Sequence, residues 1–181
     1  MAWVGVDMPA DRSSLKYQRG KSPWFPEQPK ENVMAGNTVK LHRVLRTTPE
    51  KIFRAFTDVD AMARWLPPNG FTGKVHEMDA KVGGSYRMSF TNFSTGHSHA
   101  FGGTYRELVP GERIRYTATF DDPNLPGDMQ TTVTLRKVSC GTEIHVVQEG
   151  IPEVIPVEGC YLGWQESLLH LAALVEPEIP G

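Results

Sequence analysis

The sequence predicts an α+β domain in which a curved antiparallel sheet grips one long carboxy-terminal helix. Segments with strand-like alternation, joined by short turns, run from residue 71 to residue 148, and such short connections are typical of an antiparallel meander. The helical period of residues 157–175 then gathers apolar side chains on one face, which needs an apolar surface such as that sheet to lie against. The face comprises Tyr161, Trp164, Leu168, Leu171, Ala172 and Val175.

One strand and two short helices are predicted before this run of strands. Residues 39–45 alternate imperfectly, as expected for a strand whose two faces meet different environments. Thr48 followed by Pro49 is a helix start, because the hydroxyl caps the first turn and proline has no amide hydrogen to leave unpaired there. A second helix begins around residues 58–60 and ends after Trp65, since Leu66-Pro67-Pro68 cannot continue it.

The later strands are predicted from period-two alternation and from β-branched and aromatic residues. We expect Gly84 to serve a turn, and Gly102 or Gly103 to let a long strand bend around the helix. The predicted strands span residues 71–78, 85–93, 100–108, 113–120, 129–137 and 143–148.

Two parts are predicted along the chain, a flexible amino-terminal arm over residues 1–37 and a folded domain over residues 38–181. The arm carries several prolines among polar residues, without a sustained helical or strand period. Trp24 and Phe25, flanked by prolines, leave open the alternative that the arm anchors in a groove.

Composition and charge exclude several classes of function. With 19 basic against 21 acidic residues and no dense basic cluster, neither a nucleic acid nor a membrane is an expected partner. Residues 1–11 lack the pattern of a secretory signal and no apolar stretch is long enough to span a bilayer, so the predicted location is cytoplasmic. Cys140 and Cys160 are expected to be unpaired thiols.

Short motifs over about four fifths of the chain resemble a known family, the proteins related to the activator of the heat-shock protein 90 ATPase. This family lies within the START-like, or birch-pollen-allergen, helix-grip superfamily, also called SRPBCC. The motifs are Thr48-Pro49-Glu50 with Ile52-Phe53 and Ala55-Phe56-Thr57, Trp65 before the prolines, Gly83-Gly84-Ser85-Tyr86-Arg87, Gly103-Thr104-Tyr105-Arg106-Glu107-Leu108, Pro110-Gly111-Glu112-Arg113-Ile114, Gly141-Thr142-Glu143-Ile144, and Gly163-Trp164 followed by Leu168 and Leu171.

The resemblance implies a helix-grip fold in which the two short helices close one end of the bent sheet. It also implies either of two functions. Members related to the eukaryotic activator stimulate a chaperone ATPase, whereas stand-alone domains, which this chain resembles more closely, are thought to bind small apolar or aromatic molecules.

Aromatic and apolar side chains that can face one another between the sheet and the last helix form the candidate ligand site. Buried tyrosines add hydroxyl groups that need partners and can orient a ligand. The alternative is that the same side chains simply fill the core. The candidate residues are Trp65, Tyr86, Met88, Phe90, Phe101, Tyr105, Tyr116, Phe120, Trp164, Leu168 and Leu171, with Met62, Met78 and Met129 as further adaptable walls.

Neither a metal nor a cofactor is predicted. His97 and His99 would point the same way in a strand and could share a metal ion, but no third ligand lies near them in the sequence. His76 and His145 are only distant candidates. The sequence therefore favours a solvated hairpin at this pair.

Catalytic residues are not predicted either, because no nucleophile motif is present. Glu107 has two readings. It pairs with Arg113 and Arg115 on neighbouring strands, or it faces the cavity and acts as a base in an enzyme of the cyclase or hydrolase kind.

Three functional hypotheses follow, in order of preference. The first is a non-enzymatic domain that binds a small hydrophobic or aromatic molecule, with a role linked to stress. The second is a protein that contacts a chaperone through the outside of the domain. The third is a cyclase-like or hydrolase-like enzyme that uses the cavity.

Overall fold

The computed structural model describes residues 37–179, so the predicted arm, including Trp24 and Phe25, lies outside the described residues. The helices are α1 (Pro49–Ala55), α2 (Val59–Trp65) and α3 (Val157–Val175). The strands are β1 (Val39–Leu45), β2 (Phe71–Met78), β3 (Ser85–Asn92), β4 (Ser98–Val109), β5 (Arg113–Phe120), β6 (Met129–Val138) and β7 (Gly141–Glu149). The elements follow the predicted order, and the predicted strand ends differ by at most two residues.

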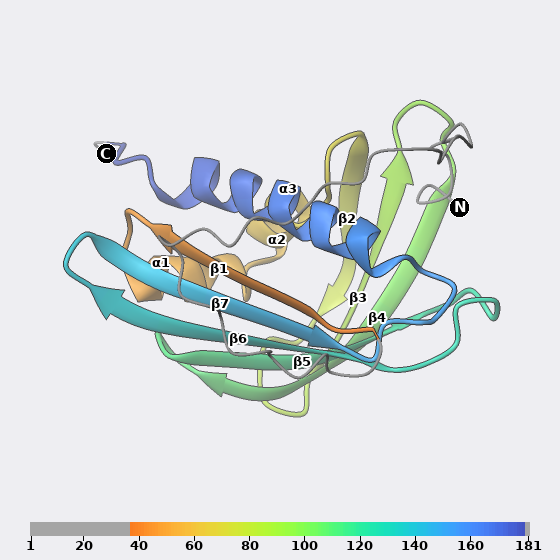
Figure 1. Cartoon of the computed structure of the whole chain (residues 1–181), viewed down its shortest axis with the longest axis horizontal. Helices are drawn as coiled ribbons and strands as arrows, with labels where there is room; N and C mark the ends of the chain where they lie inside the picture. The colour runs from red at the N-terminus through yellow and green to blue at the C-terminus, as the bar shows by residue number, and fades with distance from the viewer. Residues whose placement is uncertain (1–36, 180–181) are drawn as a thin grey trace, which may run out of the picture. The chain divides into compact units, whose positions relative to one another are not determined.

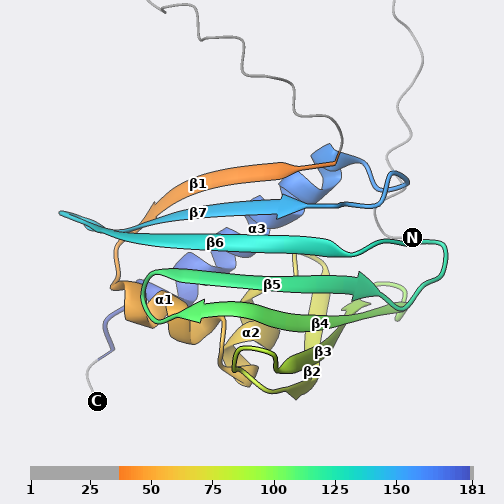
Figure 2. The same ribbon diagram turned by 90° about the horizontal axis from the view of Figure 1, so that it is seen from below.

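Residues 37–179 form one curved sheet of 7 strands, in the order β1-β7-β6-β5-β4-β3-β2 (Figure 2). Every neighbouring pair is antiparallel. From β2 to β7 the order follows the chain as a meander, whereas β1 pairs with β7, the last strand. Consequently β1 and β2 are the two edges of the sheet, and the first and last strands lie side by side.

Helix α3 lies along the concave side of the sheet, which we call the inner face, and the opposite side is the outer face (Figure 1). It contacts β1 and both short helices, which close one end of the assembly. This arrangement confirms the helix-grip architecture. The buried side of α3 comprises Gly163, Trp164, Ser167, Leu168, Leu171, Ala172 and Val175.

Tyr161 corrects the predicted buried face of α3. Its side chain is 40% exposed, although the helical period assigns it to the apolar stripe. Tyr161 lies in the second turn of the helix, where the half-buried Cys160 and the buried Gly163 lie on the side that packs inward. The period fixes the direction of the stripe, whereas the extent of the surface beneath it decides where burial stops.

Hydrogen bonds to main-chain carbonyls fix the two short helices to the rest of the domain. Trp65 Nε1 donates to the Ala55 carbonyl at 2.8 Å, joining α2 to α1. The Ser167 hydroxyl on α3 donates to the Leu66 carbonyl at 2.6 Å. These carbonyls lie at helix ends, where main-chain acceptors need partners outside the helix, so the contacts also complete the helices.

Strand β4 bends where Gly103 comes close to β5. A Cβ atom at Gly103 would lie 1.8 Å from the Thr117 carbonyl oxygen, so no larger residue fits there. The pairing of β4 with β5 also shifts register between Tyr105 and Glu107. Both features are typical of strongly curved sheets, and they support the expected role of this glycine pair.

Within residues 37–179, none of the helices has the length and apolar character required to cross a membrane. Cys140 is exposed and Cys160 is half-buried, and both are free thiols, as predicted.

Candidate functional site

Most of the predicted ligand-binding side chains lie in the closed core. Their relative exposure is at most 8%, and they belong to one apolar cluster that includes α1, α2 and α3. The members in the core are Trp65, Tyr86, Met88, Tyr105, Tyr116, Trp164, Leu168 and Leu171.

The buried tyrosines Tyr86, Tyr105 and Tyr116 pack against one another, with ring centroids 5.6 to 6.3 Å apart. The Tyr86 hydroxyl donates to the Thr117 carbonyl at 2.9 Å, and the Tyr105 hydroxyl donates to the Phe56 carbonyl at 3.1 Å. Main-chain carbonyls of the protein therefore already accept the hydrogen bonds that these two hydroxyls donate.

Burial raises the pKa of all these tyrosines, that of Tyr105 to about 12. At neutral pH the phenols are consequently uncharged. They order the core and are unsuited to exchanging protons with a substrate.

Trp164 is held by a polar contact inside the fold. Its Nε1 donates to Gln148 Oε1 at 2.8 Å, and Gln148 Nε2 lies 3.8 Å from Met129 Sδ. Across residues 37–179, every buried side-chain nitrogen or oxygen has a hydrogen-bond partner. The polar groups of the core are thus satisfied without a ligand.

Three predicted residues remain only partly buried: Phe90 on β3, Phe101 on β4 and Phe120 on β5. We call them the phenylalanine row. Phe101 meets Phe90 edge to face with centroids 5.0 Å apart, and it meets Phe120 at 6.0 Å. Phe101 and Phe120 are also directly paired in the sheet register. The row therefore offers an aromatic surface that the core does not fully cover.

A pocket of about 340 Å³ lies where β4 begins and β5 ends, and we call it the β4–β5 pocket. Of the predicted site residues, only Phe120 lines it. The complete lining is His97, Ser98, His99, Ala100, Phe120, Asp121 and Asp122.

The charges of this pocket come from two neighbouring aspartates with different partners. Asp121 is paired with the Arg87 guanidinium. Asp122 accepts hydrogen bonds from the main-chain and side-chain nitrogens of Asn124, each at 2.8 Å, and these contacts lower the pKa of its carboxyl group. The pocket therefore combines an aromatic wall with an ionised carboxylate.

His97 and His99 do lie together, with ring centroids 4.8 Å apart, although His97 precedes the strand. Burial lowers the pKa of His99, and the neighbouring His97 lowers it further, so His99 is neutral at pH 7. The distant candidates are engaged elsewhere. His76 Nε2 lies 2.9 Å from Ser89 Oγ, and His145 lies beside Glu143.

Glu107 forms the ion pairs with Arg113 and Arg115 that are the first of its two predicted alternatives. Its carboxylate lies 3.3 Å from Arg113 Nη1 and 3.5 Å from Arg115 Nη2. It pairs in register with Arg115, an exposed residue that lies opposite in direction to the buried Ile114 and Tyr116. Glu107 therefore lies on the outer face, and the reading that places it as a base in the cavity is wrong.

Sequence reasoning misses the aspartates of the pocket because residues 121–127 lie between two predicted strands, where aspartate, asparagine, proline and glycine are typical of a turn. The available signal was the position of Asp121 and Asp122 directly after Phe120, a predicted site residue at the end of a strand. Pairing of β4 with β5 then brings them to the beginning of β4, which contributes His99.

Comparison with known proteins agrees with this fold. The family model described as Activator of Hsp90 ATPase homolog 1-like protein matches residues 46–176. No curated protein matches the chain.

Among solved structures, protein CV1439 from Chromobacterium violaceum is 63% identical, with a TM-score of 0.78, over 78% of this chain and 99% of that one. A protein from Rhodobacter sphaeroides is 22% identical, with a TM-score of 0.65, over 75% of this chain and 90% of that one. A protein from Arthrobacter aurescens is 15% identical, with a TM-score of 0.68, over 76% and 84% respectively.

The latter two structures share the fold alone, whereas the family model and the Chromobacterium protein cover most of this chain at the level of sequence. The chain therefore belongs to the family of Activator of Hsp90 ATPase homolog 1-like proteins.

Proposed function

We propose that this domain binds a small molecule with an apolar or aromatic body and a hydrogen-bond-donating group. The observation that carries the proposal is the partly buried phenylalanine row, whose last member, Phe120, is also a wall of the β4–β5 pocket. A volume of about 340 Å³ suits a small ligand, because binding pockets in proteins start at roughly 300 Å³.

The chemistry of the pocket defines the class of ligand. Phe120 offers a ring for stacking or edge-to-face contact with an apolar body. Asp122 is ionised and accepts hydrogen bonds, so it suits an amine, amide or hydroxyl group on the same molecule. The carboxylate of Asp121 is already paired with Arg87. In this proposal Asp122 is therefore the carboxylate that accepts a hydrogen bond from the ligand.

Two of the predicted residues in the closed core are neighbours of the phenylalanine row. Met88 pairs in register with Phe101, and Tyr116 precedes Phe120 by four residues on β5. In this proposal they hold the phenylalanine row in place, and the ligand reaches them only after it has contacted the row.

The test is a screen of small aromatic amines, amides and alcohols, read by the melting temperature and by tryptophan emission of the whole chain. Phe120→Ala and Asp122→Asn should each weaken the binding of a hit by about tenfold, since each removes one of the two contacts. Phe93→Ala is the matched control. Phe93 is a phenylalanine of the β3–β4 turn that is 81% exposed and lies outside the pocket lining.

A variant that fills the pocket gives an independent test. His99 lines the pocket and is half-buried, and it pairs in register with Phe90, so it lies on the same face as the phenylalanine row. His99→Trp should therefore abolish the response to ligands while the chain stays folded. A tryptophan at Leu168, deeper in the fold, is a poorer choice because Leu168 is only 2% exposed and the larger ring would overpack the core. The proposal fails if no compound stabilises the chain, or if Phe93→Ala weakens binding as much as Phe120→Ala.

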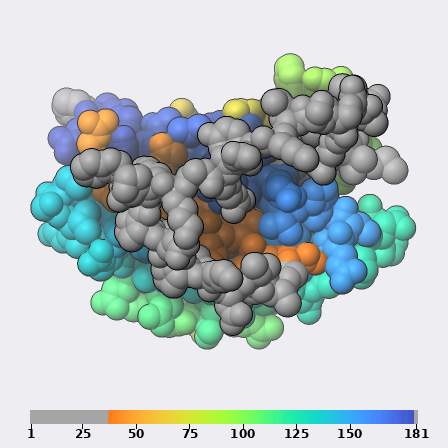
Figure 3. All heavy atoms as spheres, viewed as in Figure 1, coloured from red at the N-terminus to blue at the C-terminus, as the bar shows by residue number. Residues whose placement is uncertain are grey.

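A second candidate function is contact with a chaperone of the Hsp90 class through the outside of α3. Leu162 and Leu169 are 57% and 53% exposed, and they lie two helical turns apart on the same side of the helix. In the view of Figure 3, α3 (blue) lies along the upper part of the described residues, above β1 (orange). Exposed leucines spaced in this way suit a protein partner, and the description of the family names an activator of the Hsp90 ATPase.

This second function is tested by measuring ATP hydrolysis by purified Hsp90 with and without the chain. Stimulation that is lost in the double variant Leu162→Ser, Leu169→Ser and kept in Phe120→Ala would assign a chaperone contact to α3. If the wild-type chain leaves the ATPase rate unchanged, this candidate is wrong, and the ligand proposal is unaffected.

A further inference from the structure

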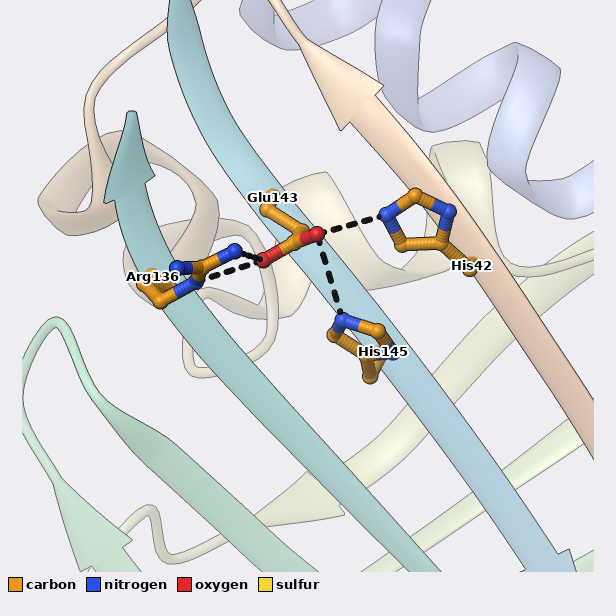
Figure 4. A network of polar contacts seen from close by, with 4 residues as sticks. All are labelled: His42, Arg136, Glu143 and His145. Carbon is orange, nitrogen blue, oxygen red and sulfur yellow. Dashed lines mark hydrogen bonds and ion pairs between the residues drawn. The ribbon is translucent and has the colours of Figure 1, made fainter. Parts of the chain in front are cut away.

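A polar cluster on the outer face joins β1, β7 and β6, on the opposite side of the sheet from α3. His42 on β1 and His145 on β7 are directly opposite in register, with ring centroids 4.6 Å apart. Glu143 precedes His145 by two residues, so its side chain lies on the same face of β7. Its Oε1 lies 2.9 Å from His42 Nε2 and 3.5 Å from His145 Nε2 (Figure 4).

We propose that His42, Glu143 and His145, called here the His–Glu cluster, bind a divalent transition-metal ion such as Zn²⁺. One ligand atom from each of these residues lies within 4.8 Å of the others. We assign Glu143 Oε1 and the two Nε2 atoms, because these are the atoms in close contact. Ligands of a tetrahedral zinc ion are about 3.3 Å apart, because each lies about 2.0 Å from the metal. The separations of 2.9 and 3.5 Å from Oε1 bracket that value. The spread of up to 4.8 Å within the set is larger, so the ligand atoms that lie farthest apart must approach each other when a metal ion binds.

Arg136 on β6 orients the carboxylate from its other oxygen. Its Nε lies 2.6 Å and its Nη2 lies 2.5 Å from Glu143 Oε2 (Figure 4). This leaves Oε1 directed between the two histidines. The hydrogen bond from Arg136, and then that from His42, lowers the pKa of Glu143, so the ligand is a charged carboxylate. The positive charge of Arg136 opposes a cation, which limits the affinity of the site.

The solvent exposure of the two histidines determines which further ligands a bound metal ion can have. The side chains of His42 and His145 are 51% and 49% exposed, whereas Glu143 is 14% exposed. A metal ion can therefore reach the histidines directly from solvent, and water can occupy its fourth position. The mixture of imidazole and carboxylate suits Zn²⁺, Ni²⁺ or Cu²⁺, and it disfavours Mg²⁺ and Ca²⁺, which prefer oxygen ligands.

A metal ion at this site would stabilise the pairing of the edge strand β1 with β7. Among the strands of residues 37–179, β1 pairs only with β7. The cluster bridges these two strands through His42 and Glu143, which lie 101 positions apart in the sequence. A metal ion that binds only the paired strands stabilises the folded chain. This inference departs from the expectation that no metal is bound, and it is independent of the β4–β5 pocket, whose lining it does not share.

The competing interpretation is a set of ion pairs in which protonated histidines contact Glu143 without a metal. The two interpretations require opposite protonation states of the imidazoles. A metal ion binds the neutral imidazole and competes with a proton for its nitrogen, whereas an ion pair with Glu143 requires the protonated ring.

The test measures thermal unfolding of the whole chain, first treated with a chelator and then titrated with ZnCl₂ at pH 7.5. At free Zn²⁺ near 100 times the dissociation constant, we expect the melting temperature to rise by about 5–10 °C. His42→Ala, His145→Ala and Glu143→Gln should each remove most of the rise. MgCl₂ and CaCl₂ at the same concentration should have no comparable effect.

The double variant His97→Ala, His99→Ala is the matched control, because it removes another histidine pair of similar spacing and should keep the full response. Binding of Co²⁺, read by its visible absorption, reports coordination directly and does not depend on stability. The proposal is overturned if Zn²⁺ leaves the wild-type melting temperature unchanged, if the His42→Ala variant responds like the wild type, or if the response disappears in the His97, His99 control.

Discussion

The inner face of the sheet has two parts that are built from the same types of residue and differ in what covers them. In one part, Tyr105 of β4 and Tyr116 of β5 are at most 4% exposed and belong to the closed core, which also contains Trp164 of α3. At the other part, where β4 begins and β5 ends, Phe101 and Phe120 are only partly buried and the β4–β5 pocket opens beside them. The alternation of aromatic residues along a strand thus predicts which face of the sheet a side chain occupies. Whether that side chain is enclosed in the core or left partly exposed depends on the elements that pack over it.

The largest expected effect is in the covered part. Trp164→Ala should lower the free energy of unfolding by about 3–5 kcal/mol, because the indole is only 8% exposed and donates a hydrogen bond to Gln148. Urea denaturation measures the change. A cost near 1 kcal/mol would mean that the indole faces an open space, and the distinction between the two parts would disappear.

Alkaline pH should act next, also in the covered part. Burial raises the pKa of Tyr105 from 10.0 to about 12. Between these values the unfolded chain releases the phenolic proton while the folded chain keeps it, so the stabilisation is complete below pH 10 and is lost as the pH rises towards 12. The loss from Tyr105 alone is about 2–3 kcal/mol. Unfolding measured from pH 8 to 12 tests this. Tyr105→Phe should reduce the loss by that amount and leave the part that comes from Tyr86 and Tyr116, whose pKa values burial also raises.

A smaller loss of stability is expected in the open part. Phe120→Ala should cost about 2 kcal/mol, less than Trp164→Ala, because part of the ring already contacts solvent. Phe93→Ala, at a side chain that is 81% exposed, is the control and should stay within about 0.5 kcal/mol of the wild type. If Phe120→Ala costs as much as Trp164→Ala, the phenylalanine row belongs to the closed core.

Removal of a single buried hydroxyl should have a modest effect at neutral pH. Tyr105→Phe deletes the hydrogen bond to the Phe56 carbonyl and should cost about 1 kcal/mol. Tyr161→Phe, at a tyrosine that is 40% exposed, should be close to neutral. Equal costs for the two variants would show that the hydroxyl of Tyr105 contributes nothing to the covered part.

The smallest effect is expected from deletion of residues 1–34, which lie outside the described residues. Their composition predicts that the melting temperature changes by less than a few degrees. A larger fall would indicate that Trp24 and Phe25 pack on the domain, and the comparison of covered and open parts would then have to include the arm.

Particular residues show how far sequence reasoning reaches into the candidate site. Trp164 and Leu168 were assigned to the gripped face by helical period, and both are buried. Glu107 could not be assigned to a face, because the register shift between Tyr105 and Glu107 reverses the direction in which the later side chains point. His42 and Glu143 were not associated at all, since nothing in a sequence states that the first strand pairs with the last.

Local signals in the sequence are sufficient to predict the order of the elements, the start of α1, both ends of α2 and the direction of the apolar stripe of α3, because caps, prolines and periodicity act over a few residues. Tertiary structure alone decided which aromatic residues are enclosed, where the β4–β5 pocket lies, and that His42 meets His145. These features depend on contacts between segments far apart in the chain, and strand pairing and curvature fix such contacts only when the whole sheet has formed.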